Sequence, residues 1–303
     1  MRRKTSLDTF GVSMLVGFAL LFAVNQVIIK LVNVGLQPVF FAGLRSAGAL
    51  VCVWLWMVLN GRPLRFERGT IGAGLLVGVV FSAEFLFLFL ALDHTTVVRS
   101  SILFYSMPVW LAIAAHFFLP GERITRPKAL GLTLAFAGVC WAILARGDAG
   151  QASLFGDICA VLAAMGWAAT AFMTRASALV RVRAEMQLFW MVLVSAVILL
   201  ALSPLFGPLI RDLQPIHLVG LAIQIVLVAT AGFILWLWLL SVYPASSVAS
   251  FSFLTPIFGV ALGWLGLGES VGWGTLGAVG LVAVGIILIN RAPRITHQPL
   301  KLP

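Results

Sequence analysis

Two residues of opposite charge, Arg45 and Glu84, lie inside long apolar stretches of the chain, where a charged group is costly. At about 1.5 Å per helical residue, both lie roughly 10 to 12 Å from the same end of their stretches. Their matched depth and opposite sign predict that they pair, or approach one another, across a central cavity. Two other interpretations stay open. The pair could only hold helices together, or Glu84 could bind and release a proton, because burial favours a neutral carboxyl group.

Three uncharged polar residues, Asn25, Tyr105 and Gln224, fall at the same depth by the same count. Polar side chains inside apolar segments usually face the interior of a helix bundle or a wet cavity. The five residues are therefore predicted to form one polar layer that binds a ligand.

Pro108 and Pro256 lie 148 residues apart in similar surroundings, Tyr-Ser-Met-Pro and Phe-Leu-Thr-Pro. Each proline removes a backbone donor near the middle of its stretch, and matched interruptions in two repeats point to a substrate site. Nearby hydroxyl groups could bind the ligand or simply satisfy the interrupted backbone. These hydroxyl groups belong to Ser101, Tyr105, Ser106, Ser250, Ser252 and Thr255.

Tryptophans supply the candidate apolar contacts. Trp167 and Trp190 are placed in the predicted pocket, and Trp236 and Trp238 are further candidates. Trp167 is unusual because small residues surround it, from Ala163 to Ala169. A large ring on such a helix either projects into a cavity or fills a groove of a neighbouring helix, and the sequence leaves both open.

The elements that must position these residues are repeated. Gly121-Glu122 and Gly268-Glu269 lie 147 residues apart, each following a proline and an apolar run. One half of the chain is therefore a duplicate of the other. The predicted copies are residues 1–147 and 152–292, followed by a tail, 293–303.

The composition identifies both copies as membrane segments. The chain of 303 residues is 61% hydrophobic and only 10% charged, with a mean hydropathy of +1.09. Five segments in each copy are long enough to cross a bilayer. With an odd number of spans, the copies have opposite orientations, so the predicted fold is an all-α integral membrane protein with two inverted five-helix repeats. The predicted spans are 11–32, 37–59, 70–92, 97–118, 128–145, 154–174, 185–207, 216–240, 244–267 and 272–290.

The basic residues predict the orientation of these spans. Alternate connections and both termini carry 15 of the 20 Lys and Arg residues, whereas the other side carries four and Arg45 lies within a span. Since cytoplasmic loops carry the excess of basic residues, both termini are expected in the cytoplasm.

Several kinds of chemistry are not encoded. The three cysteines, Cys52, Cys140 and Cys159, stand singly in apolar runs without metal-ligand spacing. The sequence lacks a phosphate-binding glycine loop for ATP, a zinc-protease motif and a nucleophile elbow. Its basic residues are dispersed, so a nucleic-acid partner is not expected. We expect no cofactor and no metal, and as partners only the lipid bilayer and a small-molecule substrate.

The motifs resemble the EamA repeat of the drug/metabolite transporter superfamily, over nearly the whole chain. Pro38 and Arg45 match its second helix. The other matching residues are Phe81-Ser-Ala-Glu84, Ala91-Leu92, Pro108, Gly121-Glu122-Arg123, Pro256 and Gly268-Glu269. The resemblance implies a ten-helix carrier in the bacterial inner membrane. Its central cavity would come mainly from the first four helices of each half, and the helices 128–145 and 272–290 would be peripheral.

Family members export amino acids and other small metabolites, and the YddG type exports aromatic and neutral amino acids. The resemblance therefore implies a monomer-competent secondary carrier that moves a small amphipathic metabolite, an amino acid first of all, by alternating access. The alternatives are a proton-coupled drug or metabolite exporter that uses Glu84, and more distantly a passive channel or an intramembrane enzyme. The second copy carries no acid corresponding to Glu84 and has Gln187 in the helix that corresponds to that of Arg45.

Overall fold

A computed structural model describes residues 8–118, 124–145, 152–243 and 251–290. Within these ranges the elements are helices, and the one pairing of strand type is an isolated bridge between Leu36 and Ile210. Eight helical segments of this described part are long and apolar enough to cross a membrane, and two shorter apolar helices are also present. The predicted all-α membrane fold is confirmed.

The first half follows the predicted spans closely. Its fourth span is interrupted at Tyr105 and Ser106, directly before the sequence Met107-Pro108, because proline offers no backbone N–H to continue the helix. The elements are α1 (Thr9–Val32), α2 (Pro38–Leu59), η1 (Arg68–Thr70), α3 (Ile71–His94), α4 (Val97–Phe104), α5 (Met107–Phe118) and α6 (Arg126–Leu144).

The second half is less regular than predicted. The span 216–240 is not one uniform helix, because a π-helical segment, η4, lies in its middle; the Thr230 hydroxyl group donates to the Ile225 carbonyl oxygen, five residues back, at 2.8 Å. The elements are α7 (Leu154–Ala176), η2 (Ala178–Arg181), α8 (Ala184–Leu202), η3 (Ser203–Phe206), α9 (Pro215–Ile223), η4 (Gln224–Gly232), α10 (Phe233–Val242), η5 (Phe251–Phe253), α12 (Leu254–Leu267) and α13 (Trp273–Asn290).

Corresponding helices begin in the same way in the two halves. The Asp8 carboxylate accepts a hydrogen bond from Gly11 N (2.9 Å) at the start of α1, and the Ser153 hydroxyl oxygen accepts one from Gly156 N (3.0 Å) at the start of α7. Both residues are N-caps, which satisfy backbone donors that the first helical turn leaves free. The spacing is 145 residues in both cases, so the repeat extends to the local signals that start its helices.

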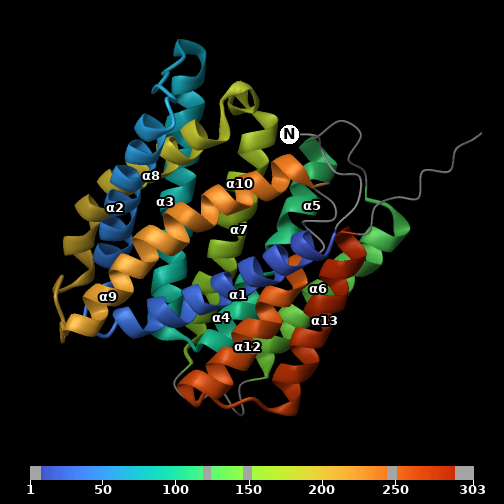
Figure 1. The fold of residues 1–303 in the computed structure, drawn as a ribbon. Helices are drawn as coiled ribbons and strands as arrows, with labels where there is room; N and C mark the ends of the chain where they lie inside the picture. Colours follow the sequence, from blue (N-terminus) through green and yellow to red (C-terminus); the bar gives the residue numbers. More distant parts are fainter. Residues whose placement is uncertain (1–7, 119–123, 146–151, 244–250, 291–303) are drawn as a thin grey trace, which may run out of the picture.

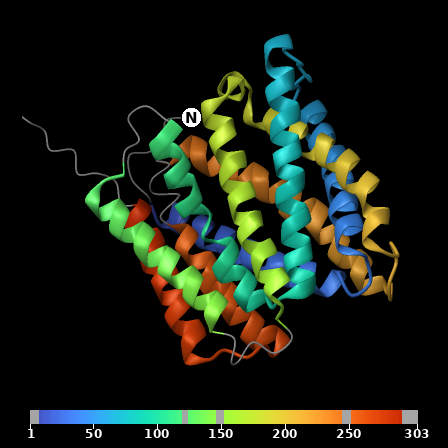
Figure 2. The same cartoon turned by 180° about the vertical axis from the view of Figure 1, so that it is seen from behind.

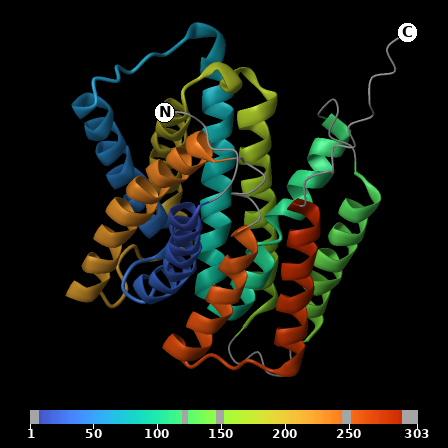
Figure 3. The same cartoon turned by 45° about the vertical axis from the view of Figure 1, so that its right-hand side comes forward.

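The two halves pack mainly against each other. The most extensive contacts pair α3 with α7, α2 with α8, α1 with α12, and α6 with α13. Figures 1 and 2 show α6 and α13 side by side, and Figure 3 sets this pair at the edge opposite α2. The core of the molecule is therefore the interface between the repeats.

Close backbone contacts hold α6 against α13. A Cβ atom added to Gly285 would lie 2.6 Å from the Gly131 carbonyl oxygen, and one added to Gly131 would lie 2.8 Å from the Gly285 carbonyl oxygen. The repeat spacing of 147 relates this contact to a second one, in which a Cβ atom on Gly138 would lie 2.8 Å from the Ala278 carbonyl oxygen. Small residues permit such approach between membrane helices.

Gly285→Leu should lower the thermal midpoint of the purified protein in detergent, because the added side chain would push α6 and α13 apart, at a cost of about 1 to 3 kcal/mol. Gly280→Leu is the matched control on the same helix, since a Cβ atom there would meet no described atom within 4 Å. Differential scanning fluorimetry compares the two variants. Equal midpoints would contradict the close packing of α6 on α13.

Candidate functional site

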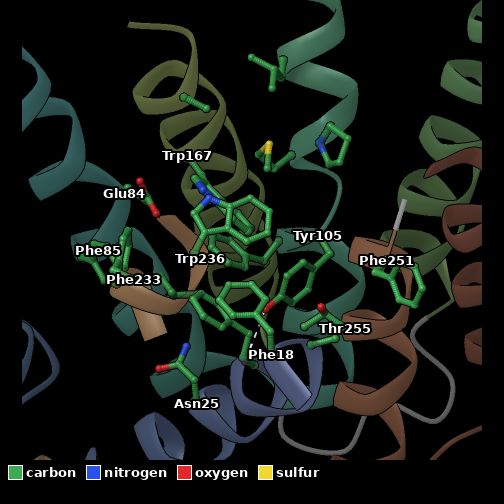
Figure 4. Close-up of a pocket in the computed structure, with 18 of the residues that line it drawn as sticks. Phe18, Asn25, Glu84, Phe85, Tyr105, Trp167, Phe233, Trp236, Phe251 and Thr255 are labelled. Carbon is green, nitrogen blue, oxygen red and sulfur yellow. Dashed lines mark hydrogen bonds between the residues drawn. The ribbon is translucent and has the colours of Figure 1, made fainter. Parts of the chain in front are cut away.

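A cavity of about 260 Å³ lies between the two halves (Figure 4). Its walls come from α1 to α5 in the first half and from α7, α10, η5 and α12 in the second. Among the described residues, α6 and α13 contribute none, as the resemblance implied. Helices α8 and α9 also contribute none. The seventh span, which includes α8, therefore does not join the wall, although the resemblance implied a cavity formed mainly by the first four helices of each half.

Nine of the 20 residues that line the cavity are aromatic. Trp167 stacks on Phe104 with 5.0 Å between ring centroids and meets Tyr105 edge-on at 5.9 Å. Phe18 stacks on Trp236 with 4.9 Å between ring centroids. Such rings offer a large apolar surface. The aromatic residues of the wall are Phe18, Phe22, Phe85, Phe104, Tyr105, Trp167, Phe233, Trp236 and Phe251.

The small residues of α7 explain the position of Trp167. A Cβ atom on Gly166 would lie 3.0 Å from the Cα atom of Glu84, so α7 approaches α3 closely at this point. With the small-residue face turned to α3, the adjacent Trp167 side chain reaches the cavity, where Figure 4 shows it among the other aromatic residues of the wall. Of the two interpretations of this ring, the structure agrees with projection into a cavity and not with the filling of a groove.

Equivalent positions of the two repeats line the cavity together. Phe85 corresponds to Phe233 and Leu88 to Trp236 at the repeat spacing of 148, and all four are wall residues. Met107 and Thr255 also share that spacing, and Phe22 and Trp167 share the spacing of 145 that relates α1 to α7. The cavity therefore follows the internal symmetry of the chain.

Arg45 and Glu84 both line the cavity and are nearly inaccessible, with 3% and 4% of their surfaces exposed. Among the described residues they do not form an ion pair with each other. The Arg45 guanidinium lies over the Phe85 ring, 4.3 Å from its centroid, whereas Glu84 Oε2 accepts a hydrogen bond from the Thr170 hydroxyl group at 3.3 Å. Of the two predicted arrangements, a direct pair and an approach across a cavity, the structure shows no direct ion pair, and both side chains line the same cavity.

The other members of the predicted polar layer divide into two groups. Asn25 and Tyr105 line the cavity. Gln224 lies behind the wall, where its Nε2 donates to the Asn25 carbonyl oxygen at 3.0 Å. Ser101 is also outside the wall, and its hydroxyl group donates to Gln26 Oε1 at 3.2 Å. Both outer residues therefore support the wall rather than face the cavity.

The two prolines take different positions. Pro108 lines the cavity, whereas Pro256 is buried outside the wall, next to the wall residue Thr255. The Ser106 hydroxyl group donates to the Leu103 carbonyl oxygen at 2.6 Å, so it satisfies the interrupted backbone locally. The expected symmetric placement of both prolines around one cavity is therefore not observed.

The sequence pattern of the EamA-like transporter family matches the chain twice, over residues 9–144 and 154–291. The chain belongs to this family. Two curated relatives from Bacillus subtilis (strain 168) support the assignment. The uncharacterized transporter YoaV is 21% identical over 282 residues, which cover 90% of this chain and 94% of the relative. The uncharacterized transporter YvbV is 27% identical over 197 residues, which cover 63% of this chain and 62% of the relative.

A solved crystal structure has the same fold. It matches this EamA-like transporter with a TM-score of 0.66 at 17% sequence identity, and the match covers 92% of this chain and 96% of the other. At this level of identity, the comparison concerns the fold alone.

The remaining predicted site residues of this transporter lie elsewhere. Trp190 packs on Gly74, where an added Cβ atom would lie 2.6 Å from its ring, and it meets Phe66 edge-on at 5.2 Å. It therefore fills a groove between helices. Ser250 lies outside the described residues, and Ser252 is described only by its backbone. In the described part of the chain, no cluster of His, Cys, Asp or Glu could hold a metal ion.

Sequence reasoning missed most of the apolar wall. Phe18, Phe104, Phe233 and Phe251 were not predicted, because phenylalanine is abundant in this chain, with 22 copies, and an apolar residue in a span gives no local signal. One signal was present for Phe233. It follows from Phe85 by the repeat spacing, and Phe85 directly follows the predicted site residue Glu84.

Polar contacts join the halves at the end of the molecule where α4 begins. The Glu269 carboxylate, from the second half, accepts hydrogen bonds from Val97 N (2.8 Å) and Val98 N (2.7 Å) in the first turn of α4. Nearby, Arg99 Nη2 lies 2.6 Å from Asp157 Oδ2 in a buried ion pair across the halves. Arg99 lies within α4 and is buried. The glutamate of the second Gly-Glu pair, Glu269, therefore caps a helix of the first half.

Glu269→Ala should lower the thermal midpoint, because it removes an N-terminal cap with a charge that favours the helix dipole, a loss of about 0.5 to 2 kcal/mol. Glu269→Gln should fall between this variant and wild type, since one side-chain oxygen still accepts. Glu67→Ala, which alters an exposed glutamate in the connection between α2 and α3, is the control. A midpoint of Glu269→Ala equal to that of the control would refute the cap.

Proposed function

We propose that this EamA-like transporter is a secondary carrier that exports small amphipathic metabolites, above all neutral and aromatic amino acids. The observation that carries the proposal is the cavity at the interface of the two repeats, with an aromatic wall and two buried charges. Pockets of this composition suit a ligand with an apolar side chain and a polar head group. The chain works as a monomer in the bacterial inner membrane, with both termini in the cytoplasm, an orientation supported by the distribution of Lys and Arg.

Transport proceeds by alternating access. Sites at the interface of inverted repeats are exposed to one side and then to the other when one half rocks against its counterpart. In this chain the two halves make contacts that such a movement would exchange, including the Glu269 cap on α4. A gradient of the substrate, or of protons, supplies the free energy.

Proton-coupled export of drugs or metabolites is the second candidate. It is favoured by one observation, the buried Glu84 carboxylate in the cavity wall. A carboxyl group at this position would bind its proton on one side of the membrane and release it on the other.

Counterflow in proteoliposomes tests the carrier. We expect saturable uptake of labelled phenylalanine that is accelerated by unlabelled phenylalanine inside the vesicles, because a carrier must bind and reorient at each passage. A channel would show neither saturation nor acceleration. The assay with and without a pH gradient separates the two candidates: a proton-coupled exporter accumulates substrate against its gradient when a pH gradient is applied, and Glu84→Gln abolishes that accumulation. No transport of any amino acid would refute the proposed substrate class.

Trp167→Ala should impair transport of phenylalanine more than that of methionine, and that of threonine least, because the lost contact area scales with the apolar side chain. The measurement is the initial rate of efflux for the three amino acids. Trp190→Ala is the matched control: its ring lies outside the cavity, so it should reduce the amount of folded protein and leave the ratios of the three rates unchanged. An equal loss for all three substrates in Trp167→Ala would identify Trp167 as a packing residue.

A further inference from the structure

Arg45 has unused hydrogen-bonding capacity inside the cavity. Its guanidinium group carries five N–H donors, and among the described residues its Nε has no hydrogen-bond partner. Arg45 is nonetheless only 3% exposed as a residue, and the Phe85 ring covers one face of its guanidinium group. Burying a charged group without partners is costly, so the arrangement favours a ligand that brings acceptor oxygens.

Glu84 presents the opposite charge to the same cavity. Thr170 holds its Oε2 atom from α7, and the contact of Glu84 with Gly166 fixes the backbone behind it. Asn25 adds a second acceptor, because its Oδ1 atom is buried and has no partner among the described residues. Figure 4 shows Glu84 and Asn25 on one side of the aromatic cluster, with Thr255 and Phe251 on the other. Two acceptors thus lie close to the space that Arg45 also lines.

Arg45 and Glu84 do not form a direct ion pair, although both line the same cavity. Opposite charges in an apolar interior attract strongly, and a direct ion pair would satisfy both groups. Each side chain is instead held by its own neighbour, Arg45 by Phe85 and Glu84 by Thr170. Both charges therefore remain available to the cavity.

We propose, building on the function above, that Arg45 and Glu84 form a divided receptor for the zwitterionic head group of an α-amino acid. Arg45 binds the α-carboxylate. Glu84, assisted by Asn25 Oδ1, binds the α-ammonium group. The side chain of the amino acid lies against the rings of Trp167 and Trp236.

The two repeats differ at the position of Glu84, and this difference supports a role of Glu84 in binding rather than in folding. At the repeat spacing of 148, the position equivalent to Glu84 is Gly232, at the end of η4. The second half builds its corresponding span without a charge there, so the fold itself does not require one. Because both charges come from the first half, the head group is expected on that side of the cavity.

Charge balance makes this receptor selective. A zwitterion satisfies both buried charges, whereas an amine leaves Arg45 without a partner and a carboxylic acid leaves Glu84 without one. A site built to bind a polar group rejects an analogue that lacks the group, because its own buried polar atoms stay unpaired. The receptor should therefore distinguish phenylalanine from phenethylamine, which lacks the carboxylate, and from 3-phenylpropionate, which lacks the ammonium group.

Equilibrium binding to the purified full-length protein in nanodiscs tests this assignment. Wild type should bind phenylalanine at least about tenfold more tightly than either analogue, with protein-free nanodiscs as the blank. Arg45→Gln should weaken phenylalanine by roughly ten- to a hundredfold and leave phenethylamine unchanged. Glu84→Gln should weaken phenylalanine similarly and leave 3-phenylpropionate unchanged. Trp190→Phe, outside the cavity, should change none of the three affinities.

The outcomes separate the two proposals. If wild type binds phenylalanine no better than both analogues, or if each variant weakens all three ligands equally, the divided receptor is wrong while the exporter stands. If wild type binds none of the twenty amino acids and shows no counterflow with them, the proposed substrate class fails and the receptor with it. The wild-type comparison needs no substitution, so it decides the question even if a charge variant fails to fold.

Discussion

Several buried polar groups of this protein have their partners across the interface between its halves, and this constraint shapes that interface. A buried polar atom without a partner is costly. The Glu269 carboxylate caps α4, Arg99 pairs with Asp157, and Thr170 binds Glu84, and each of these contacts crosses from one half to the other. The polar contacts that join the repeats therefore also position the wall of the cavity.

Close packing supplies the rest of the interface. Glycines bring helices of the two halves together. Gly166 of α7 packs against Glu84 of α3, Gly74 of α3 packs against Trp190 of α8, and Gly131 of α6 packs against Gly285 of α13. Where a glycine packs against a neighbouring helix, the side chains next to it on its own helix point in other directions. On α7 this effect directs Trp167 into the cavity, whereas on α8 the complementary fit with α3 removes Trp190 from it. Two tryptophans of similar promise in the sequence thus have different roles.

The symmetry of the fold and the asymmetry of its chemistry serve different ends. Repeat-related positions such as Phe85 and Phe233 supply matching parts of the wall. The charges of Arg45 and Glu84 have no counterparts of the same kind in the second half. Under the proposed alternating access, the proposed head-group site of the first half would hold a substrate in one orientation while the surrounding helices exchange their contacts.

The sequence alone determined the class of the protein and its duplicated architecture. Length, hydropathy and a repeat spacing near 147 are properties of the chain itself, and a span of about 20 apolar residues has few alternatives to a membrane helix. The rise of a helix also predicted one polar layer for Asn25, Arg45, Glu84 and Tyr105, and all four residues line the same cavity.

Only the tertiary structure decided which way each side chain faces. Helices such as α3 and α8 are apolar on all sides, because lipid and protein interior are both apolar environments, and their periodicity therefore does not reveal the buried face. For that reason the sequence could not separate Trp167 from Trp190, assign Pro108 but not Pro256 to the wall, or show that Arg45 and Glu84 stay apart. Those choices depend on the fit between helices from opposite halves, which is set by contacts far apart in the chain.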